Sequence, residues 1–190
     1  MIEYEELYGI VKSKLSEERF KHSEGVVKRA LEYSEIYNVD REIIKLAAIA
    51  HDIAKELTEE EVKYFLNKYN IELDDIEKIN KSLLHAKIGA SICEKEFGFN
   101  NDMVNAVRYH TTGRENMSVL EKIIYLADAT EENRDYDYNE YVNVIKEDID
   151  KGMVMVSKWV IDSLTRRGRM IHLDSIKCYN YYIKSMLNKM

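Results

Sequence analysis

Histidine and aspartate side chains recur along this chain of 190 residues in apolar, helix-like surroundings. The clearest case is the pair His51-Asp52, which stands inside the alanine-rich run from Ala47 to Lys55. A charged group in such a buried run is costly unless it is paired or binds a metal ion. Imidazole and carboxylate groups together suit Fe, Mn, Co, Ni or Zn. In chain order, the candidate metal ligands are His22, His51, Asp52, His85, His110 and Asp128.

An isolated histidine-aspartate pair has a simpler interpretation, a core histidine held in place by its neighbouring carboxylate. The other four candidates favour a metal site gathered from several helices, because each has its own apolar helical context. Helical periodicity shows only that each candidate lies on a helix or at its end. The sequence order by itself does not place these side chains next to one another.

Several residues near these candidates could contact a phosphate. Lys55 is three positions after Asp52 and four after His51, which predicts the same face of a helix. The loop that directly follows His110 could hold a phosphate through its backbone N–H groups and its cation, and a helix C-terminal cap is compatible with that role. Arg134 is either another phosphate ligand or a solvated arginine. The loop consists of Thr111, Thr112, Gly113 and Arg114.

Helical periodicity and capping residues divide the chain, because it contains no proline and only seven glycines. No segment alternates with the period of a strand, no repeat is present and no linker separates two parts, so the sequence predicts one all-α domain. His172 precedes the last expected helix and is interpreted as structural or as an edge of the substrate site. The expected helices run from Glu3 to Leu15, from Ser16 to about Asn38, from Asp40 to about Leu57, from Thr58 to about Asn70, from about Asp75 to Gly98, from Met103 to His110, from Ser118 past Asp128, through Trp159 to Gly168, and from Asp174 onward.

Composition argues against several classes of partner. Hydrophobic residues at 45% and charged residues at 33% are typical of a soluble globular protein. The net charge of −7, with no basic block, speaks against binding to nucleic acid or to an anionic membrane. Cys93 and Cys178 lack CxxC spacing, so buried thiols in a reducing cytoplasm are expected. The acidic N-terminus is unlike a signal peptide, and no apolar run approaches the length of a membrane span.

The order H…HD…H…H…D is similar to that of the HD-domain metallophosphohydrolases with a two-metal site. A bare HD dipeptide is weak evidence, but the segments around the candidates resemble the YqeK-like branch, the bacterial symmetrical diadenosine tetraphosphate hydrolases. The resemblance extends over nearly the whole chain from Glu18 onward. Family members often have proline where Glu132 and Leu173 stand here, which leaves the substrate fit open. The matching segments are His22–Val26, His51–Lys55, Leu84–Ala90, Tyr109–Arg114, Met117–Asp128 and Arg167–His172.

This resemblance implies a single HD-domain helical bundle over residues 1–190, with a core of about residues 18–130 and C-terminal helices packed on it. It implies two transition-metal ions, with iron favoured and Mn, Co, Ni or Zn as alternatives. The metal-bridging hydroxide would attack an inner phosphate of the dinucleotide and give two ADP. One metal ion would take His22, His51, Asp52 and Asp128, and the second would share Asp52 and take His85 and His110. The catalytic residues would be Asp52 and Lys55, and the substrate-binding residues Lys55, Thr111, Thr112, Gly113, Arg114 and Arg134.

Other functions stay open at this point. The ligand pattern also suits an HD phosphohydrolase that acts on nucleoside mono- or triphosphates or on cyclic dinucleotides. An iron-containing site could serve a di-iron oxygenase, although the phosphate-directed cations speak against it. A nucleotide-binding domain without catalysis is the last alternative, and the complete ligand set disfavours it. The sequence does not determine the oligomeric state, so a homodimer is one open arrangement.

Overall fold

The computed structural model describes residues 1–134 and 136–188, and all regular structure within them is helical. This confirms the all-α fold class. The N-terminal helices and the short 3-10 helix η1 are α1 (Tyr4–Lys14), α2 (Glu17–Tyr37), α3 (Arg41–Ala50), α4 (Glu59–Lys68), α5 (Asp75–Ile79), η1 (Lys81–Leu83) and α6 (Leu84–Phe97). The remaining helices are α7 (Asn101–Tyr109), α8 (Val119–Thr130), α9 (Asn139–Glu147), α10 (Ile149–Arg166) and α11 (Leu173–Leu187).

Capping residues set the helix ends much as the sequence predicts. The Ser16 side chain accepts a hydrogen bond from the backbone N–H of Arg19 at the start of α2. Thr58 and Ser118 open α4 and α8 with complete capping boxes, in which each side chain and a glutamate three positions later satisfy each other's backbone N–H groups. Gly98 ends α6 in the left-handed conformation with φ 70°, which glycine adopts without a Cβ clash.

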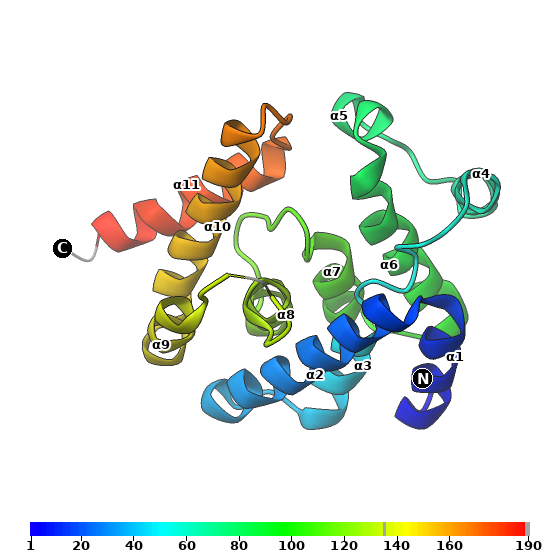
Figure 1. Ribbon diagram of the computed structural model, residues 1–190, viewed down its shortest axis with the longest axis horizontal. Helices are drawn as coiled ribbons and strands as arrows, with labels where there is room; N and C mark the ends of the chain where they lie inside the picture. The colour runs from blue at the N-terminus through cyan, green and yellow to red at the C-terminus, as the bar shows by residue number, and fades with distance from the viewer. Residues whose placement is uncertain (135, 189–190) are drawn as a thin grey trace.

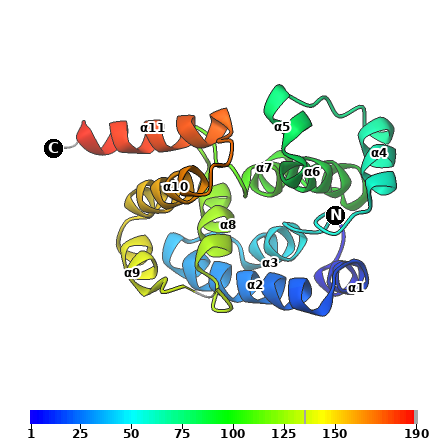
Figure 2. The ribbon, with the colours of Figure 1, turned by 45° about the horizontal axis from the view of Figure 1, so that its top comes forward.

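The helices arrange around α3, α7 and α8, which lie in the middle of the molecule (Figure 1). Helix α2 packs along α3 and α8, and α7 packs against α6 and α8. Helices α4 and α5 lie at one end of the molecule and α9, α10 and α11 at the other, as Figure 2 also shows. The shared core contains fully buried side chains such as Ile49 of α3, Val107 of α7 and Ile124 of α8. Burial of these apolar side chains fixes the central helices against one another.

Two expected helices are shorter than the periodicity predicts. The central helix ends at Ala50 instead of about Leu57, because residues 51–56 form tighter turns with bonds from Ile53 N–H to the Ala50 carbonyl and from Lys55 N–H to the Asp52 carbonyl. The expected helix from Asp75 to Gly98 is broken at Asn80 into α5, η1 and α6. There the asparagine side chain accepts from the backbone N–H of Ser82 and so competes with the helical hydrogen bond.

The C-terminal part contains two helices where the sequence predicts one helix through Trp159 to Gly168. Helix α9 buries Val142 and Ile145, and Asp148 then separates it from α10, because the Asp148 side chain accepts from the backbone N–H groups of Asp150 and Lys151 at the start of α10. Helix α11 is capped by His172 and not by Asp174, since the imidazole accepts from the Asp174 backbone N–H. Among the described residues, no helix is both long and apolar enough to cross a membrane.

Candidate metal centre

Five helices bring the six candidate ligands to one place in the middle of the molecule. His22 lies on the second turn of α2, and Asp128 lies near the end of α8. His51 and Asp52 follow the last residue of α3, where the tighter turns begin. His85 is in the first turn of α6, and His110 caps the C-terminus of α7. The early end of α3 therefore matters for the site, because it determines where the side chains of His51 and Asp52 point.

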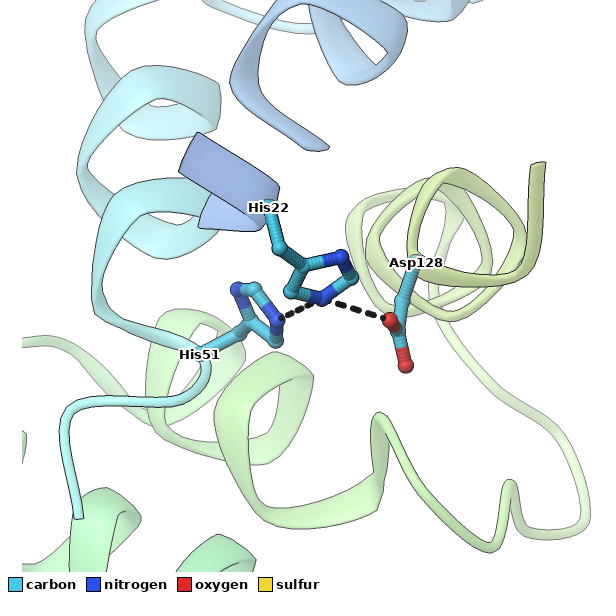
Figure 3. Close-up of side chains that lie close together, drawn as sticks. All are labelled: His22, His51 and Asp128. Atoms are coloured by element: carbon cyan, nitrogen blue, oxygen red, sulfur yellow. Dashed lines mark hydrogen bonds and ion pairs between the residues drawn. The ribbon is translucent and has the colours of Figure 1, made fainter. Parts of the chain in front are cut away.

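The first group of side chains consists of His22, His51 and Asp128 (Figure 3). The Nε2 atoms of the two histidines are 3.3 Å apart, and His22 Nε2 is 3.1 Å from Asp128 Oδ1. Their donor atoms all lie within 4.8 Å of one another. Two imidazole nitrogens and one carboxylate oxygen are a suitable donor set for one divalent transition-metal ion.

The second group is built around Asp52. Its Oδ1 atom is 3.0 Å from His85 Nε2 and 3.5 Å from His110 Nε2, and those two nitrogens are 3.1 Å apart. Its Oδ2 atom is 3.6 Å from His51 Nε2 and 3.9 Å from His22 Nε2. One carboxylate oxygen therefore faces each half of the cluster, an arrangement that a single imidazole could not provide.

The outer nitrogens of the histidines fix which atom faces the cluster. Nδ1 of His51 lies 2.7 Å from the Ala48 carbonyl oxygen, and His85 and His110 make the same contact three residues back, to Ser82 and Val107, also at 2.7 Å. A carbonyl oxygen can only accept, so Nδ1 carries the proton and the Nε2 lone pair points inward. Backbone acceptors of this kind orient metal-binding histidines.

Neutral imidazoles whose lone pairs face one another at such distances repel unless a cation lies between them. Burial lowers the pKa of His51 to about 3 and that of His85 to about 4, so both rings stay neutral at physiological pH. Asp52 Oδ1 is buried and, within the described part of the chain, has no hydrogen-bond partner. A buried acceptor without a partner is costly, and a divalent cation would satisfy it. The residues of the cluster thus fit metal ions.

His22 differs from the other histidines because carboxylates face both of its nitrogens. Burial opposes a charge on the ring, but Asp128 at Nε2 and Glu131 at Nδ1, each 3.1 Å away, raise the pKa of His22 above its ordinary value. Despite burial, contacts with His22 and Arg134 keep the pKa of Asp128 well below its usual range. In the metal-free protein a proton on His22 Nε2 therefore occupies the position that a metal ion would take.

Metal uptake should consequently strengthen as the pH rises. A ligand that must lose its proton binds metal less tightly below its pKa, and the pKa of His22 lies above the ordinary value of 6.5. We expect the affinity for Mn²⁺ to increase from about pH 6 to about pH 8, with a proton released on binding. Calorimetric titration in buffers of different ionisation enthalpy measures that proton. An affinity that stays constant over this range would contradict the assignment of His22 as a ligand.

Three predicted substrate contacts lie beside the cluster. Lys55 Nζ is 3.2 Å from His85 Nε2 and 3.6 Å from Asp52 Oδ1. Thr111 Oγ1 is 3.1 Å from His110 Nε2. Arg134 donates to the Asp128 carboxylate and, through two nitrogens, to its backbone carbonyl. These three side chains are therefore in reach of a group bound at the cluster.

The rest of the loop after Thr111 makes contacts elsewhere. The Thr112 hydroxyl donates to the Gly113 carbonyl, and Gly113 has φ +66°. A Cβ on this glycine would lie 2.6 Å from Cys178 Sγ, so the loop packs closely on α11. Arg114 donates two hydrogen bonds to the buried Glu121 carboxylate. The guanidinium thus fastens the loop to α8, and its contact with a phosphate stays a prediction.

The sequence reading missed two residues that touch the cluster. The Arg19 Nη2 atom is 3.4 Å from Asp52 Oδ2, and the arginine precedes His22 by one helical turn. The three-residue spacing between Arg19 and His22, which places both on one face of a helix, was the sequence signal for Arg19. Glu131 is buried, faces His22 Nδ1 and accepts two hydrogen bonds from Asn133. It is 109 positions from His22, so no local pattern could have found it.

His172 lies outside this cluster. Its Nε2 atom is 2.7 Å from Asp74 Oδ2, which joins the start of α11 to the start of α5. This position agrees with a structural role for the ring. The same contact places His172, Asp74 and Glu77 together as another group of metal-binding residue types, although the Glu77 carboxylate is held by Lys87 and Arg108.

Comparison with known proteins shows which family this chain is similar to. The HD domain model matches residues 19–133. The symmetrical bis(5'-nucleosyl)-tetraphosphatase of Halalkalibacterium halodurans is 36% identical, over 90% of this chain and 92% of that protein. The corresponding enzyme of Bacillus subtilis is 33% identical, over 94% of this chain and 97% of its own length.

One solved structure is also similar to this chain in fold and in sequence. The crystal structure of a predicted HD superfamily hydrolase involved in NAD metabolism, from Clostridium acetobutylicum, superposes with a TM-score of 0.91 at 35% identity. The match covers 97% of this chain and 99% of that one. An HD domain implies binding of divalent metal ions. The donor atoms of two groups here, one of His22, His51 and Asp128 and one of His51, Asp52 and His110, lie close enough together to hold such ions. The chain therefore belongs to the HD-domain hydrolases, within the family of the symmetrical bis(5'-nucleosyl)-tetraphosphatases.

Proposed function

We propose that this protein hydrolyses diadenosine tetraphosphate to two molecules of ADP, using two transition-metal ions with iron as the favoured metal. One observation carries the proposal, namely two donor groups that meet at the pair His51-Asp52. Two-metal sites hold their ions close together, so one carboxylate could contribute an oxygen to each ion. The carboxylate of Asp52, with one oxygen toward each half of the cluster, is suited to that position.

The distances support a proposed division of the ligands between the two ions. We assign His22, His51 and Asp128 to one ion, with Asp52 shared, and His85 and His110 to the other. His51 Nε2 lies close to both groups, and its ring is 5.3 Å from that of His22 and 5.0 Å from that of His110, centre to centre. When bound, the ions would acidify a water molecule and offset the negative charge of the phosphoryl oxygens.

The chain's own cations would position the phosphates. Arg19 lies next to Oδ2 of Asp52, and Lys55 lies next to its Oδ1. Each of the two side chains remains 29% exposed, so both can also reach a ligand. The Thr111 hydroxyl can donate to a phosphate oxygen next to His110. Arg134 has its donors on Asp128 and would act mainly by holding that carboxylate. Fixed donors around the reacting phosphate lower the barrier because they need not reorganise during the reaction.

The position of cleavage provides the test. Reaction of diadenosine tetraphosphate with Mn²⁺- or Fe²⁺-loaded protein, followed by chromatography, should give ADP as the sole nucleotide product. Attack at an inner phosphorus is expected because the clamped phosphate chain presents only one phosphorus atom to the nucleophile. AMP together with ATP would show that the chain binds in another register. No nucleotide product from metal-loaded protein would refute the proposed reaction, and a screen of nucleoside triphosphates and cyclic dinucleotides would then separate the alternatives.

Replacement of Lys55 tests the phosphate contact separately from the metals. Lys55→Ala should lower kcat/KM by about a hundredfold, because one fixed cation at the reacting phosphate is lost. The metal content should stay at the wild-type value, since lysine is not among the ligands. Lys158→Ala is a matched control, because this exposed lysine pairs only with Asp162 within α10 among the ion pairs found. Wild-type turnover in Lys55→Ala would exclude the contact.

We also propose a cytoplasmic location. The two cysteines support it, because Cys93 and Cys178 are both buried free thiols. Burial raises the pKa of Cys93 above its ordinary value and that of Cys178 to about 12, so neither thiol is reactive.

A further inference from the structure

A buried carboxylate lies behind the His22 ring, on the side away from the candidate metal centre. Both dashed lines in Figure 3 end at Nε2 of His22, the nitrogen that faces His51 and Asp128. On the other side of the ring, Nδ1 lies 3.1 Å from Oε1 of Glu131, the residue that directly follows α8. Glu131 is only 1% exposed, and a buried carboxylate is costly unless its oxygens have partners. A residue outside the six candidate ligands therefore contacts one of them directly.

His22 differs in this contact from the other three histidines of the cluster. His51, His85 and His110 lie at or next to the end of a helix, and Nδ1 of each faces a backbone carbonyl three residues earlier. His22 lies within the regular helix α2, where the backbone carbonyls accept helical hydrogen bonds. Glu131 supplies the acceptor instead, and a charged carboxylate is a stronger acceptor than a carbonyl.

Several contacts hold the Glu131 carboxylate in this position. Its Oε2 atom accepts from the backbone N–H of Asn133 at 2.7 Å and from the side-chain amide of the same residue at 2.8 Å. Arg134 Nε lies 3.8 Å from Oε1. Gly25 follows His22 by three residues on α2 and leaves the space that the carboxylate fills. A Cβ on Gly25 would overlap Glu131 Oε2 and lie 2.7 Å from Asn133 Nδ2, so the absence of a side chain there lets Glu131 reach His22.

We propose that Glu131 is a positioning residue, which orients His22 toward a metal ion bound by the first group of side chains. The inference rests on the proposed function in taking metal ions as the ligands of the cluster. A carboxylate at Nδ1 keeps a proton on that nitrogen, so the lone pair of the ring lies on Nε2. The negative charge behind the ring also makes the imidazole a stronger donor to a cation. Gly25 and Asn133 act through Glu131, because they determine where its oxygens lie.

Binding of Mn²⁺ tests this role without any nucleotide. Calorimetry on protein freed of metal should show that Glu131→Ala weakens the Mn²⁺ affinity by about tenfold or more, the usual cost of removing the partner of a metal-binding histidine. Gly25→Ala should act in the same direction although it leaves the carboxylate chemically unchanged, because the new Cβ displaces it. Gly9→Ala is the matched control, since this glycine is also helical and nothing lies within 4 Å of an added Cβ. It should bind Mn²⁺ as the wild type does.

Two further measurements separate positioning from general structural support. If Glu131 acts through His22, adding Glu131→Ala to His22→Ala should change the remaining Mn²⁺ affinity by less than about twofold. A further tenfold loss in that background would overturn the proposal. In the Zn²⁺-loaded protein, the proton NMR signal of His22 Nδ1–H is identified by its absence in His22→Ala. It should move upfield in Glu131→Ala, because its hydrogen bond is lost, and an unchanged signal would also overturn the proposal.

The outcomes distinguish this inference from the proposed reaction. Wild-type Mn²⁺ affinity in Glu131→Ala would overturn the role of Glu131, even if diadenosine tetraphosphate is hydrolysed to ADP. Absence of hydrolysis by the wild type would refute the reaction and leave the metal-binding comparison intact. If Glu131→Ala or His22→Ala does not fold, as judged by circular dichroism, Gly25→Ala decides the question. Equal Mn²⁺ affinity in Gly25→Ala and Gly9→Ala would then overturn the proposal.

Discussion

Asp52→Asn should lower the rate of hydrolysis by a factor of about a thousand or more and reduce the metal content to one ion per chain or fewer. The carboxylate has one oxygen near His85 and His110 and the other near His51 and His22, so it is positioned to join the two groups. An amide has only one acceptor oxygen, and its NH₂ group would face imidazole lone pairs. The metal content is measured after anaerobic purification and the rate with saturating Mn²⁺.

Two comparisons make this result specific. Asp162→Asn is the same chemical change at an exposed position of α10, and it should alter neither the metal content nor the rate. The helical signal of Asp52→Asn in circular dichroism should match the wild type, because isosteric replacement leaves the core side chains in place. Two bound ions and full activity in Asp52→Asn would exclude a shared carboxylate at this position.

The helical positions of the candidate ligands and the core could be predicted from the sequence for a local reason. Each candidate ligand stands in its own helix-like segment with apolar neighbours, and the caps at Ser16, Thr58 and Ser118 mark helix starts by side-chain chemistry alone. Such signals depend on residues three or four positions apart, which a sequence displays directly. The assignment of the six side chains as metal ligands is a further step and stays a prediction.

What could not be predicted depends on residues distant in the sequence. Glu131 faces His22 across 109 positions, and the Arg114 guanidinium binds Glu121, whose burial is fixed only when α8 packs. Periodicity also overestimated the helix after Asp40, because the apolar pattern continues past Ala50 while the backbone changes to tighter turns. Contacts between residues distant in the sequence determine where such a helix ends. Here the change to tighter turns after Ala50 sets the orientation of His51 and Asp52.

The contacts of Arg134 and Arg114 revise how the phosphates are expected to be held. Both guanidinium groups already donate to carboxylates, those of Asp128 and Glu121. Residues nearer to Asp52 are then better placed to meet a phosphate, namely Lys55 and Arg19. Lys55 stays a predicted phosphate contact, and the position of Arg19 on α2 adds that residue to the prediction.

Removal of the metal ions should lower the melting temperature by roughly 10 °C. The metal-free centre holds neutral His51 and His85 rings with inward lone pairs, and a buried Asp52 oxygen has no hydrogen-bond partner among the described residues. Its ions should therefore bind the folded chain far better than the unfolded one. A ligand at about a thousand times its Kd stabilises the fold by about 4 kcal/mol, and each kcal/mol shifts the melting temperature of a domain of this size by about 2–4 °C.

This shift is measured by thermal unfolding before and after dialysis against a chelator, with metal content determined on the same samples. Readdition of Mn²⁺ should restore the original melting temperature, which separates loss of the ions from damage during dialysis. In Asp52→Asn the shift should shrink, because fewer ions bind and the fold gains less from them by mass action. A melting temperature that does not change in protein shown to have lost its metal would contradict a centre embedded in the core, since ions held at the surface by a few exposed groups would leave the packing of α2, α3 and α8 unaffected.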